Sequence, residues 1–448
     1  MYILGINDGH LATACLLQDG RVIACVSEER FTRIKNETGF PRRAVKWLIE
    51  TSAIGPGDVD LVCFLGHRAF LGSMVRSEFK RGLSHISHTP RVWMRRLEYR
   101  LPSLRPVGTA GRRAVQRIGT ALASGDRVKP LLEVLPVPED RILFVDHHTA
   151  HAYCWYGSPF IGKPSLVITL DGEGDGLSGT ISVAKDSMLT RIAQIDDTNS
   201  LGHLYSQITE YMGMKPLEHE YKVMGLAPYC SEYNIDKTYP VFAELIGLVD
   251  DTLSLRVKVR SQLVPYYLQE RLRGHRFDSI AGAIQRLIEE LIVKLVQNAI
   301  AATGIRTVVL SGGVFMNVKA NMCVMEMPEV EELFIFPSCG DESGAIGAAY
   351  YGYKQCCERQ GLPWEGESIR DLYWGPQYTD ADIERYIRDH NLAAQYIIEK
   401  PGDMIQHVAQ LLGKEKSWPV ATGGWNGAHG HLATAAFWLI HLTLISYG

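Results

Sequence analysis

Residues 165–184 read SLVITLDGEGDGLSGTISVA, an apolar run that leads directly into an acidic, glycine-rich turn. The pattern predicts a strand over Ser165–Leu170, a turn over Asp171–Ser178, a second strand over Gly179–Ala184 and a third over Leu189–Ile195. A carboxylate at the end of a strand, among glycines, has little core to serve. We therefore expect Asp171 to be a functional residue.

The first 27 residues show a comparable pattern. Strands are expected over Tyr2–Asn7, Thr13–Gln18 and Arg21–Ser27, with the hairpin dipeptide Asp19-Gly20 between the last two. Two segments that each start with an apolar strand and a glycine-containing turn indicate an internal duplication. Two such halves facing one cleft are typical of the actin-like, sugar-kinase-like and Hsp70-like nucleotide folds, so the predicted class is α/β and actin-like.

A histidine-rich run, DHHTAH, occupies residues 146–151. Positions four apart on a helix share a face, so His147 and His151 are expected to project together; His148 with a less regular partner is the alternative. Two imidazoles and the carboxylate of Asp171 would suit a divalent metal and leave positions open for a substrate. Asp341 is the candidate last ligand, because it lies in the expected turn that follows a later strand.

Two further glycine-rich turns follow a long apolar helix expected over residues 277–303. Strand Thr307–Leu310 leads into SGGVFMN at 311–317, and strand Leu333–Phe336 leads into PSCGDESGAIG at 337–347, before a helix of small residues. Phosphates can approach backbone N–H groups in such strand, turn and helix units. The alternatives are that Gly312-Gly313 is only a tight turn and that Gly344 and Gly347 only permit close helix packing.

The whole-chain composition describes a globular protein. The 448 residues exceed one ordinary core, the net charge is −4, and 46% of residues are hydrophobic. Neither membrane nor nucleic-acid binding is indicated, and the N-terminus has no basic region or cleavage site. Nine scattered cysteines without a Cys-x-x-Cys pair favour reduced thiols, so we expect a cytoplasmic protein.

One local charge bias stands out. Between Arg76 and Arg117 the sequence has eleven Lys or Arg residues against Glu78 and Glu98. A solvated helical insertion is the first interpretation, and docking of an anionic partner is the alternative.

Six motifs, in order over about residues 1–415, resemble the O-carbamoyltransferases of nodulation-factor and antibiotic biosynthesis. They are LGINDGH at 4–10, SEERFTRIK at 27–35 with Phe40-Pro41, DHHTAH at 146–151, EYKVMGLA at 220–227, LSGGVFMN at 310–317 and CGDESG at 339–344. Leu11 departs from the pattern, since the family often has Asp or Asn there.

The resemblance implies a two-part enzyme. Residues 1–365 would form an actin-like domain related to the tRNA threonylcarbamoyl transferases. Residues 366–448 would begin an incomplete α/β domain of the threonylcarbamoyl-AMP synthase (YrdC-like) type. In such enzymes the second domain makes carbamoyl adenylate from carbamoyl phosphate and ATP, and the first passes the carbamoyl group to a hydroxyl of a small-molecule or sugar acceptor.

The resemblance also implies roles for individual residues. An iron-type metal, or another divalent ion, would bind His147, His151, Asp171 and Asp341. The nucleotide pocket would be lined by Gly172, Gly312, Gly313, Gly340 and Asn317. The acceptor hydroxyl needs a base within hydrogen-bond reach, for which Asp8 or His10 is placed at a strand end. Lys35 and Lys222 would pair with phosphate or carbamoyl oxygens; for these four residues a surface or salt-bridged role is the alternative.

The end of the chain departs from the family pattern. Family members continue into an Arg- and Gly-rich segment, whereas residues 422–447 read TGGWNGAHGHLATAAFWLIHLTLISY. A shifted reading frame would permit the family motif, so we expect a frameshifted tail from about 414–422 and a C-terminally truncated enzyme. The apolar run 432–446 is shorter than the roughly 20 residues that span a bilayer.

Three other functions compete with this interpretation. They are a tRNA threonylcarbamoyl transferase-like enzyme, a noncatalytic actin-like protein that binds nucleotide and metal, and a simple sugar kinase. The expected partner is a small-molecule hydroxyl acceptor, without membrane or nucleic acid, and a homodimer is a further expectation.

Overall fold

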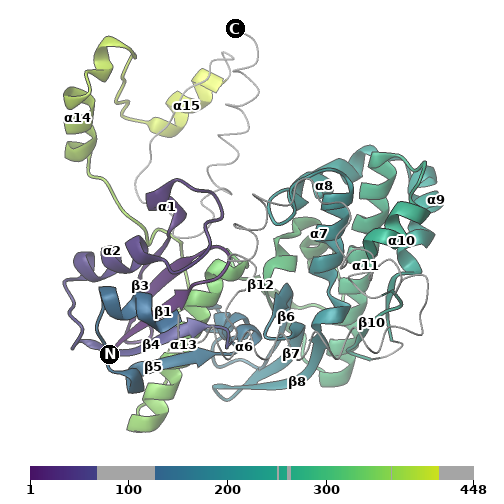
Figure 1. Ribbon diagram of the computed structural model, residues 1–448, viewed down its shortest axis with the longest axis horizontal. Coiled ribbons are helices and arrows are strands. Elements are labelled where there is room, and N and C mark those ends of the chain that lie inside the picture. The colour runs from purple at the N-terminus through teal and green to yellow at the C-terminus, as the bar shows by residue number, and fades with distance from the viewer. Residues whose placement is uncertain (68–126, 250–251, 260–263, 365, 413–448) are drawn as a thin grey trace.

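The computed structural model describes residues 1–67, 127–249, 252–259, 264–364 and 366–412 (Figure 1). The basic stretch between Arg76 and Arg117 and the tail expected to be frameshifted lie outside the described residues. Within the described part, no helix is long and apolar enough to cross a membrane.

Two five-stranded sheets share one topology. The first has the order β3-β2-β1-β4-β5 and the second β12-β11-β6-β7-β8; in each, the first three strands in sequence are antiparallel and the other two are parallel to the first. Figure 1 shows the two halves side by side. The duplication and the actin-like α/β class predicted from the sequence are thereby confirmed.

The bounds of the strands are as follows. The first sheet contains β1 (Tyr2–Asn7), β2 (Thr13–Gln18), β3 (Arg21–Ser27), β4 (Val59–Leu65) and β5 (Ile142–Val145). The second contains β6 (Ser165–Gly174), β7 (Leu177–Lys185), β8 (Met188–Asp196), β11 (Thr307–Ser311) and β12 (Glu332–Ile335), and β9 (Ile246–Leu248) pairs with β10 (Leu255–Val257).

The hairpin between β6 and β7 is longer than predicted. The expected turn over Asp171–Ser178 is wrong in its bounds, because Gly174 pairs with Leu177 and both strands continue past an irregularity that follows Leu170. Only Asp175 and Gly176 remain outside the strands. Asp171 therefore lies on an extension of β6 rather than in an open loop.

Helices surround the sheets on both halves. The first half carries α1 (Glu29–Thr32) and α2 (Arg42–Ser52), while the second carries α7 (Leu201–Tyr211), α8 (Glu220–Leu226), α9 (Glu232–Ala243), α10 (Val264–Arg271), α11 (Phe277–Thr303) and α12 (Val318–Met325). The predicted helix over 277–303 is confirmed as α11, whose buried residues include Ile284, Leu291 and Leu295. It ends at Gly304, which has a left-handed φ of 71°.

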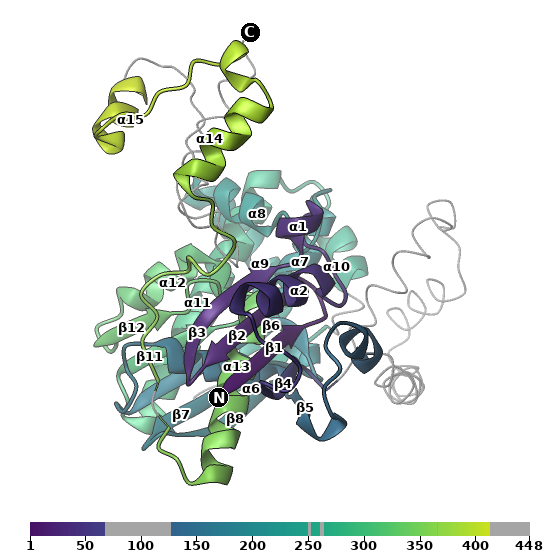
Figure 2. The ribbon, with the colours of Figure 1, turned by 90° about the vertical axis from the view of Figure 1, so that its left-hand side faces the viewer.

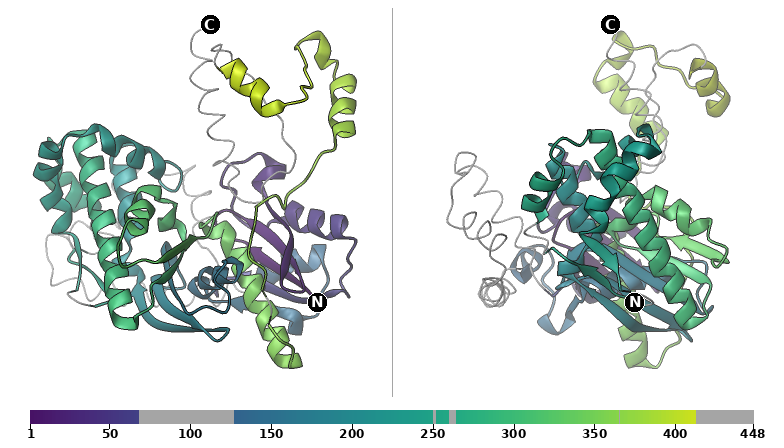
Figure 3. Two further views of the ribbon diagram at one scale, coloured as in Figure 1. Left: turned by 180° about the vertical axis from the view of Figure 1, so that it is seen from behind. Right: turned by 90° about the vertical axis from the view of Figure 1, so that its right-hand side faces the viewer.

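The last helix of each half packs on the sheet of the other half. Helix α6 (His147–Tyr153) follows β5 but contacts β6 and β7, and α13 (Asp341–Gln360) follows β12 but contacts β1, β2 and β4. In the left view of Figure 3, seen from behind, α13 is the green helix that runs across the face of the first sheet. The two helices also touch closely, since a Cβ added at Gly347 would lie 1.8 Å from the Ala150 carbonyl oxygen. The exchange brings both helix starts to the centre of the molecule.

The start of α13 differs from the sequence expectation. A turn was expected through Gly347, but the helix begins at Asp341. The physical reason is packing: a Cβ at Gly344 would lie 2.4 Å from the Leu65 side chain, so the small residues serve as a helix face against β4 and α6. For Gly344 and Gly347, close helix packing is thus what the structure shows.

The described residues after 365 begin on the first half and then leave it. The Cys25 N–H donates to the Trp374 carbonyl at 3.1 Å, and the Ile369 N–H donates to the Gly157 carbonyl at 2.8 Å. Helices α14 (Asp380–Asp389) and α15 (Met404–Leu412) follow, and α14 has no buried residue (Figure 2). The division into domains at 365/366 stays a prediction.

Candidate metal centre

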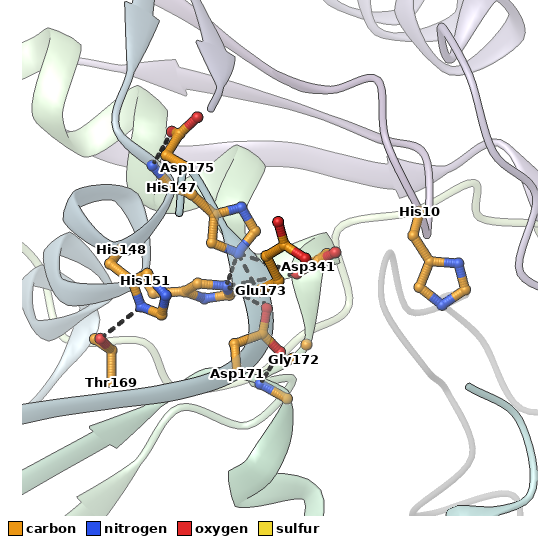
Figure 4. Close-up of polar contacts among 12 residues, drawn as sticks. His10, His147, His148, His151, Thr169, Asp171, Gly172, Glu173, Asp175 and Asp341 are labelled. Atoms are coloured by element: carbon orange, nitrogen blue, oxygen red, sulfur yellow. Dashed lines mark hydrogen bonds and ion pairs between the residues drawn. The ribbon is translucent and has the colours of Figure 1, made fainter. Parts of the chain in front are cut away.

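Four predicted ligands meet where the exchanged helices cross. His147 and His151 come from the start and middle of α6, Asp171 from β6 and Asp341 from the first position of α13. One ligand atom from each lies within 4.8 Å of the other three. Figure 4 shows the four side chains pointing toward one another.

The separations between the ligand atoms suit one shared cation. His147 Nε2 lies 3.1 Å from His151 Nε2, 3.1 Å from Asp171 Oδ2 and 3.5 Å from Asp341 Oδ1. His151 Nε2 lies 3.8 Å from Asp171 Oδ2 and 3.6 Å from Asp341 Oδ1. Ligands bound at about 2.0–2.2 Å to one ion are themselves about 3–3.6 Å apart. Four of the five separations fall in this range, and the fifth, 3.8 Å between His151 Nε2 and Asp171 Oδ2, is slightly longer.

A bound cation would satisfy ligand atoms that otherwise oppose one another or have no hydrogen-bond partner. Asp341 Oδ1 is buried and accepts no hydrogen bond, although two imidazole nitrogens face it. The two Nε2 atoms face each other at 3.1 Å, where at most one can donate to the other. Two nitrogens and two carboxylate oxygens suit iron, zinc or manganese. The residues present thus fit a divalent metal.

Electrostatics in the cluster favour holding positive charge. Burial alone would lower the pKa of His147, but its hydrogen bond with Asp171 and the nearby charge of Asp341 raise the pKa to about 9. Burial would raise the pKa of Asp171, yet the facing histidines bring it well below its usual range. Burial and the charge of Asp171 raise the pKa of Asp341. The cluster is therefore built to compensate two carboxylates with cationic charge.

Asp171 is oriented by the glycine turn after β11. Its Oδ1 accepts the Gly313 N–H at 3.1 Å, which leaves Oδ2 toward the histidines. Gly312 has φ 101°, and a Cβ there would lie 2.3 Å from the Leu170 carbonyl oxygen. Only glycine fits this close approach. Gly312-Gly313 is thus more than a tight turn, because it fixes a candidate ligand.

His148 is not part of the cluster. Its Nδ1 lies 2.9 Å from Thr169 Oγ1, and Figure 4 shows the ring turned toward that residue. Burial, together with the charges of His147 and His151, lowers the pKa of His148 to about 3. Of the two pairings left open by the sequence, the structure therefore selects His147 with His151.

Two carboxylates pair with the backbone N–H groups at the start of α6, one from its own N-cap residue and one from the β6–β7 turn. Asp146 Oδ1 accepts the Thr149 N–H at 2.9 Å and also a hydrogen bond from Arg191 on β8 at 2.5 Å. Asp175, in the β6–β7 turn, accepts the His147 N–H at 2.9 Å. A helix start leaves such N–H groups unpaired. Asp175 was missed by sequence reasoning, although its place in the same acidic turn as Asp171 was a usable signal.

The candidate bases Asp8 and His10 follow β1, in the first half. Asp8 follows β1 and forms a two-pronged ion pair with Arg127, at 2.8 Å from Nε and 2.6 Å from Nη2. His10 forms an isolated bridge with Thr38 and stands apart from the cluster in Figure 4. Arg127 was also missed, because nothing in its local sequence marks it. A role for Asp8 as base requires that ion pair to open, and both assignments stay predictions.

The two candidate lysines lie on exposed segments of opposite halves. Lys35 follows α1, and Lys222 lies on α8 with its Nζ 5.8 Å from the centre of the Tyr221 ring. The segments touch, since Asn36 Nδ2 donates to the Leu217 carbonyl at 3.3 Å. The structure therefore brings these two segments together but does not place either amine among the metal ligands.

The predicted nucleotide residues lie in three places. Gly172, with Gly312 and Gly313, lies beside Asp171, while Gly340 immediately precedes α13. Asn317 is engaged elsewhere: it exchanges two hydrogen bonds of 2.9 Å with Gln285 and caps α12. Its contact with a nucleotide stays a prediction.

Two curated relatives cover most of the chain. An uncharacterized protein, sll1178 of Synechocystis, is 26% identical over 92% of this chain and 66% of its own length. Nodulation protein NolNO of Sinorhizobium fredii is 28% identical over 90% of this chain and 54% of its own length. The chain thus spans about half to two thirds of the length of these relatives.

Solved structures give a weaker likeness. The activator of 2-hydroxyisocaproyl-CoA dehydratase from Clostridium difficile, with bound ADPNP, matches with a TM-score of 0.39 and 11% identity, over 81% of this chain and 97% of that chain. A score this low supports no argument about function.

A family model matches more than three quarters of the chain. The family model described as "Carbamoyltransferase N-terminus" matches residues 2–350, which include all four clustered ligands and the Asp-Gly pairs at 8–9 and 171–172. The chain therefore belongs to the carbamoyltransferase family.

Proposed function

We propose that this chain transfers a carbamoyl group to a hydroxyl of a small-molecule or sugar acceptor. The observation that carries the proposal is the cluster of His147, His151, Asp171 and Asp341, which the crossing of α6 and α13 assembles inside the family-matched region. The carbamoyl donor would be carbamoyl adenylate, formed from carbamoyl phosphate and ATP. The cytoplasm is the proposed location.

The four clustered residues would hold a divalent metal, iron by the resemblance to the family. When bound, such a cation offsets negative charge on a phosphate leaving group. The protein's own contribution is to fix the ligands before substrate arrives: His151 is fully buried, and Asp171 is fastened by the Gly313 N–H. Pre-set ligands avoid a reorganisation cost during the reaction.

The transfer step forms one bond at the carbamoyl carbon, breaks another there and transfers one proton. The acceptor oxygen attacks the carbamoyl carbon, the bond from that carbon to the adenylate oxygen breaks, and AMP leaves with the bonding pair. The hydroxyl proton passes to a base of the protein. Because Asp8 is held by Arg127, we assign this base to His10, which lies two residues after Asp8, beyond the end of β1.

ATP and the adenylate would bind along the glycine turns. The SGGVFMN turn at 311–317 and the CGDE turn at 339–342 each connect a parallel strand to a helix, and β11 and β12 are neighbours in the second sheet. Ligands of open parallel sheets bind outside the carboxyl ends of the strands. Lys35 and Lys222 would pair with phosphate or carbamoyl oxygens where the segments that carry them meet.

The test supplies the full chain with carbamoyl adenylate labelled in the carbamoyl carbon, a divalent metal and a panel of hydroxyl acceptors. We expect a labelled O-carbamoyl product and an equal amount of AMP. His10→Asn should abolish transfer, whereas His390→Asn, a histidine outside the two-half body, should leave it unchanged.

Other outcomes would overturn the proposal in recognisable ways. ATP binding without transfer to any acceptor would indicate the noncatalytic nucleotide-binding protein. Movement of the γ-phosphoryl group of ATP to the acceptor would indicate a sugar kinase. A product found only with tRNA would indicate the threonylcarbamoyl transferase type.

A further inference from the structure

One turn holds His147 at three points. The turn and strand residues 171–175 contact the ligand at its Nε2 atom through Asp171, at its ring through Gly174 and at its backbone N–H through Asp175. The first contact belongs to the candidate metal centre. The other two have no role in binding the ion directly.

The ring of His147 lies against bare backbone. A Cβ added at Gly174 would sit 2.1 Å from both Cγ and Cδ2 of the imidazole, far inside any tolerated contact. The ring is therefore limited on that side by the main chain of β6. Such a contact restricts the ring's position but not the position of the helix that carries it.

Asp175 restrains the helix. Its Oδ2 accepts two backbone N–H groups at 2.9 Å each, from His147 and from His67. His147 is the first residue of α6, and His67 follows the end of β4. One carboxylate oxygen thus connects the β6–β7 turn, the start of α6 and the end of β4 in the first sheet.

This connection matters because α6 is short. The helix has seven residues, and a helix of this length has little stability of its own in water. The direction of the His147 side chain depends on where the helix begins, and Asp175 fixes that point from another element. Asp146 caps the Thr149 N–H instead, so the two carboxylates do different jobs.

We propose that Asp175 is a positioning residue for the metal ligand His147, acting through the His147 backbone and tying it to the end of β4. The inference rests on the proposed metal site. It assigns to Asp175 no contact with metal or substrate. The charge of the Asp175 carboxylate also acts on His147, and we expect hydrogen-bond acceptance to contribute more to metal binding than this charge does.

The test compares three variants of the full chain. Asp175→Ala removes the acceptor, Asp175→Asn keeps an acceptor oxygen without the charge, and Asp186→Ala is the control. Asp186 also lies in a strand turn with a left-handed φ, 51° against 53° for Asp175, but it is exposed. The control therefore carries the same backbone cost of placing alanine at positive φ.

The measurement is the dissociation constant for Mn²⁺ and Fe²⁺, by competition with a chromophoric chelator, together with the Tm of the metal-free protein. Loss of a supporting hydrogen bond behind a ligand typically weakens metal binding about 10–100-fold. We expect a weakening in that range for Asp175→Ala, less than about threefold for Asp175→Asn, and no change for Asp186→Ala. The metal-free Tm should be similar in Asp175→Ala and Asp186→Ala.

Hydrogen exchange gives a second readout that needs no metal. The His147 amide should exchange faster in Asp175→Ala and at the wild-type rate in Asp175→Asn. Unchanged metal affinity in Asp175→Ala, or equal losses in both Asp175 variants, would overturn the inference while leaving the metal site intact. Failure of the wild-type chain to bind either metal would overturn the metal site and the inference together.

Discussion

The two halves place an Asp-Gly pair at the same topological point and use it differently. β1 pairs with β4 as far as Ile6, and β6 pairs with β11 as far as Thr169. Asp8 and Asp171 each follow two residues later and each precede a glycine. The duplicated scaffold thus presents a carboxylate at two equivalent strand ends.

The two carboxylates differ in the group that neutralises them. This difference distinguishes the structural ion pair at Asp8 from the candidate active site at Asp171. Arg127 reaches both oxygens of Asp8, donates to the Leu65 and Gly66 carbonyls, and lies over the Phe64 and Phe144 rings. A guanidinium carries a permanent charge and cannot be exchanged. Asp171 instead faces imidazoles, which can release a proton and accept a metal. The Asp8 end is therefore closed, in the sense that a permanent side-chain cation occupies it. The Asp171 end is open, in the sense that an exchangeable cation can bind there.

The largest effect on stability is expected at the closed end. Arg127→Met would leave Asp8, whose side chain is 12% exposed, without its partner, and removing one member of a buried pair costs about 3–5 kcal/mol. Adding Asp8→Asn should recover part of the loss. Urea unfolding measures both. A loss below about 1 kcal/mol in Arg127→Met would contradict a structural role for the pair.

Metal removal should act on the open end alone. At a metal concentration of about 100 times Kd, binding stabilises the folded state by about 2.7 kcal/mol, so a chelator should lower the unfolding free energy by that amount. Asp171→Asn should show no response to chelator, and Asp8→Asn should respond like the wild type. Equal responses in both variants would remove the distinction between the two strand ends.

A smaller effect is expected from the turn that orients Asp171. Gly312→Ala combines a left-handed φ with a Cβ 2.3 Å from the Leu170 carbonyl oxygen, and such strain costs about 1–3 kcal/mol. Gly304→Ala is the control, because its φ is 71° but nothing lies within 4 Å of the added Cβ. Thermal unfolding should show the greater loss in Gly312→Ala. Equal losses would mean that backbone conformation alone explains glycine there.

The last expected effect is a pH dependence of the metal-free protein. Because the folded-state pKa of His147 is about 9 against an ordinary 6.5, its stabilising contribution is fully present below pH 6.5 and is lost as pH rises through 9. Tm should fall by a few degrees over that interval, and His147→Gln should flatten the curve. A flat wild-type curve would contradict a protonated His147 in the metal-free protein.

Local patterns were sufficient for several elements of both halves. The alternation of apolar residues gave β1, β2 and β3 with the observed bounds, and the helical spacing gave α11. The pairing of His147 with His151 followed from their separation by four residues, since they do lie on one helix. These features depend only on neighbours in the chain.

Features that depend on distant contacts could not be predicted. The exchange of α6 and α13 between sheets, the reach of Arg127 to Asp8 and the support of His147 by Asp175 all join residues far apart in sequence. The start of α13 was placed too late, because the glycines that resemble a turn are a packing surface for Leu65 and Ala150. Helix propensity alone does not reveal such a surface.

The central claim is that His147, His151, Asp171 and Asp341 hold one divalent ion. The most direct test is metal content per chain in the wild type, in His151→Ala and in His148→Gln, after equal loading and removal of free metal. We expect one ion per chain in the wild type and in His148→Gln, because the His148 ring faces Thr169, and loss of the ion in His151→Ala. Stoichiometric metal retained in His151→Ala would contradict it.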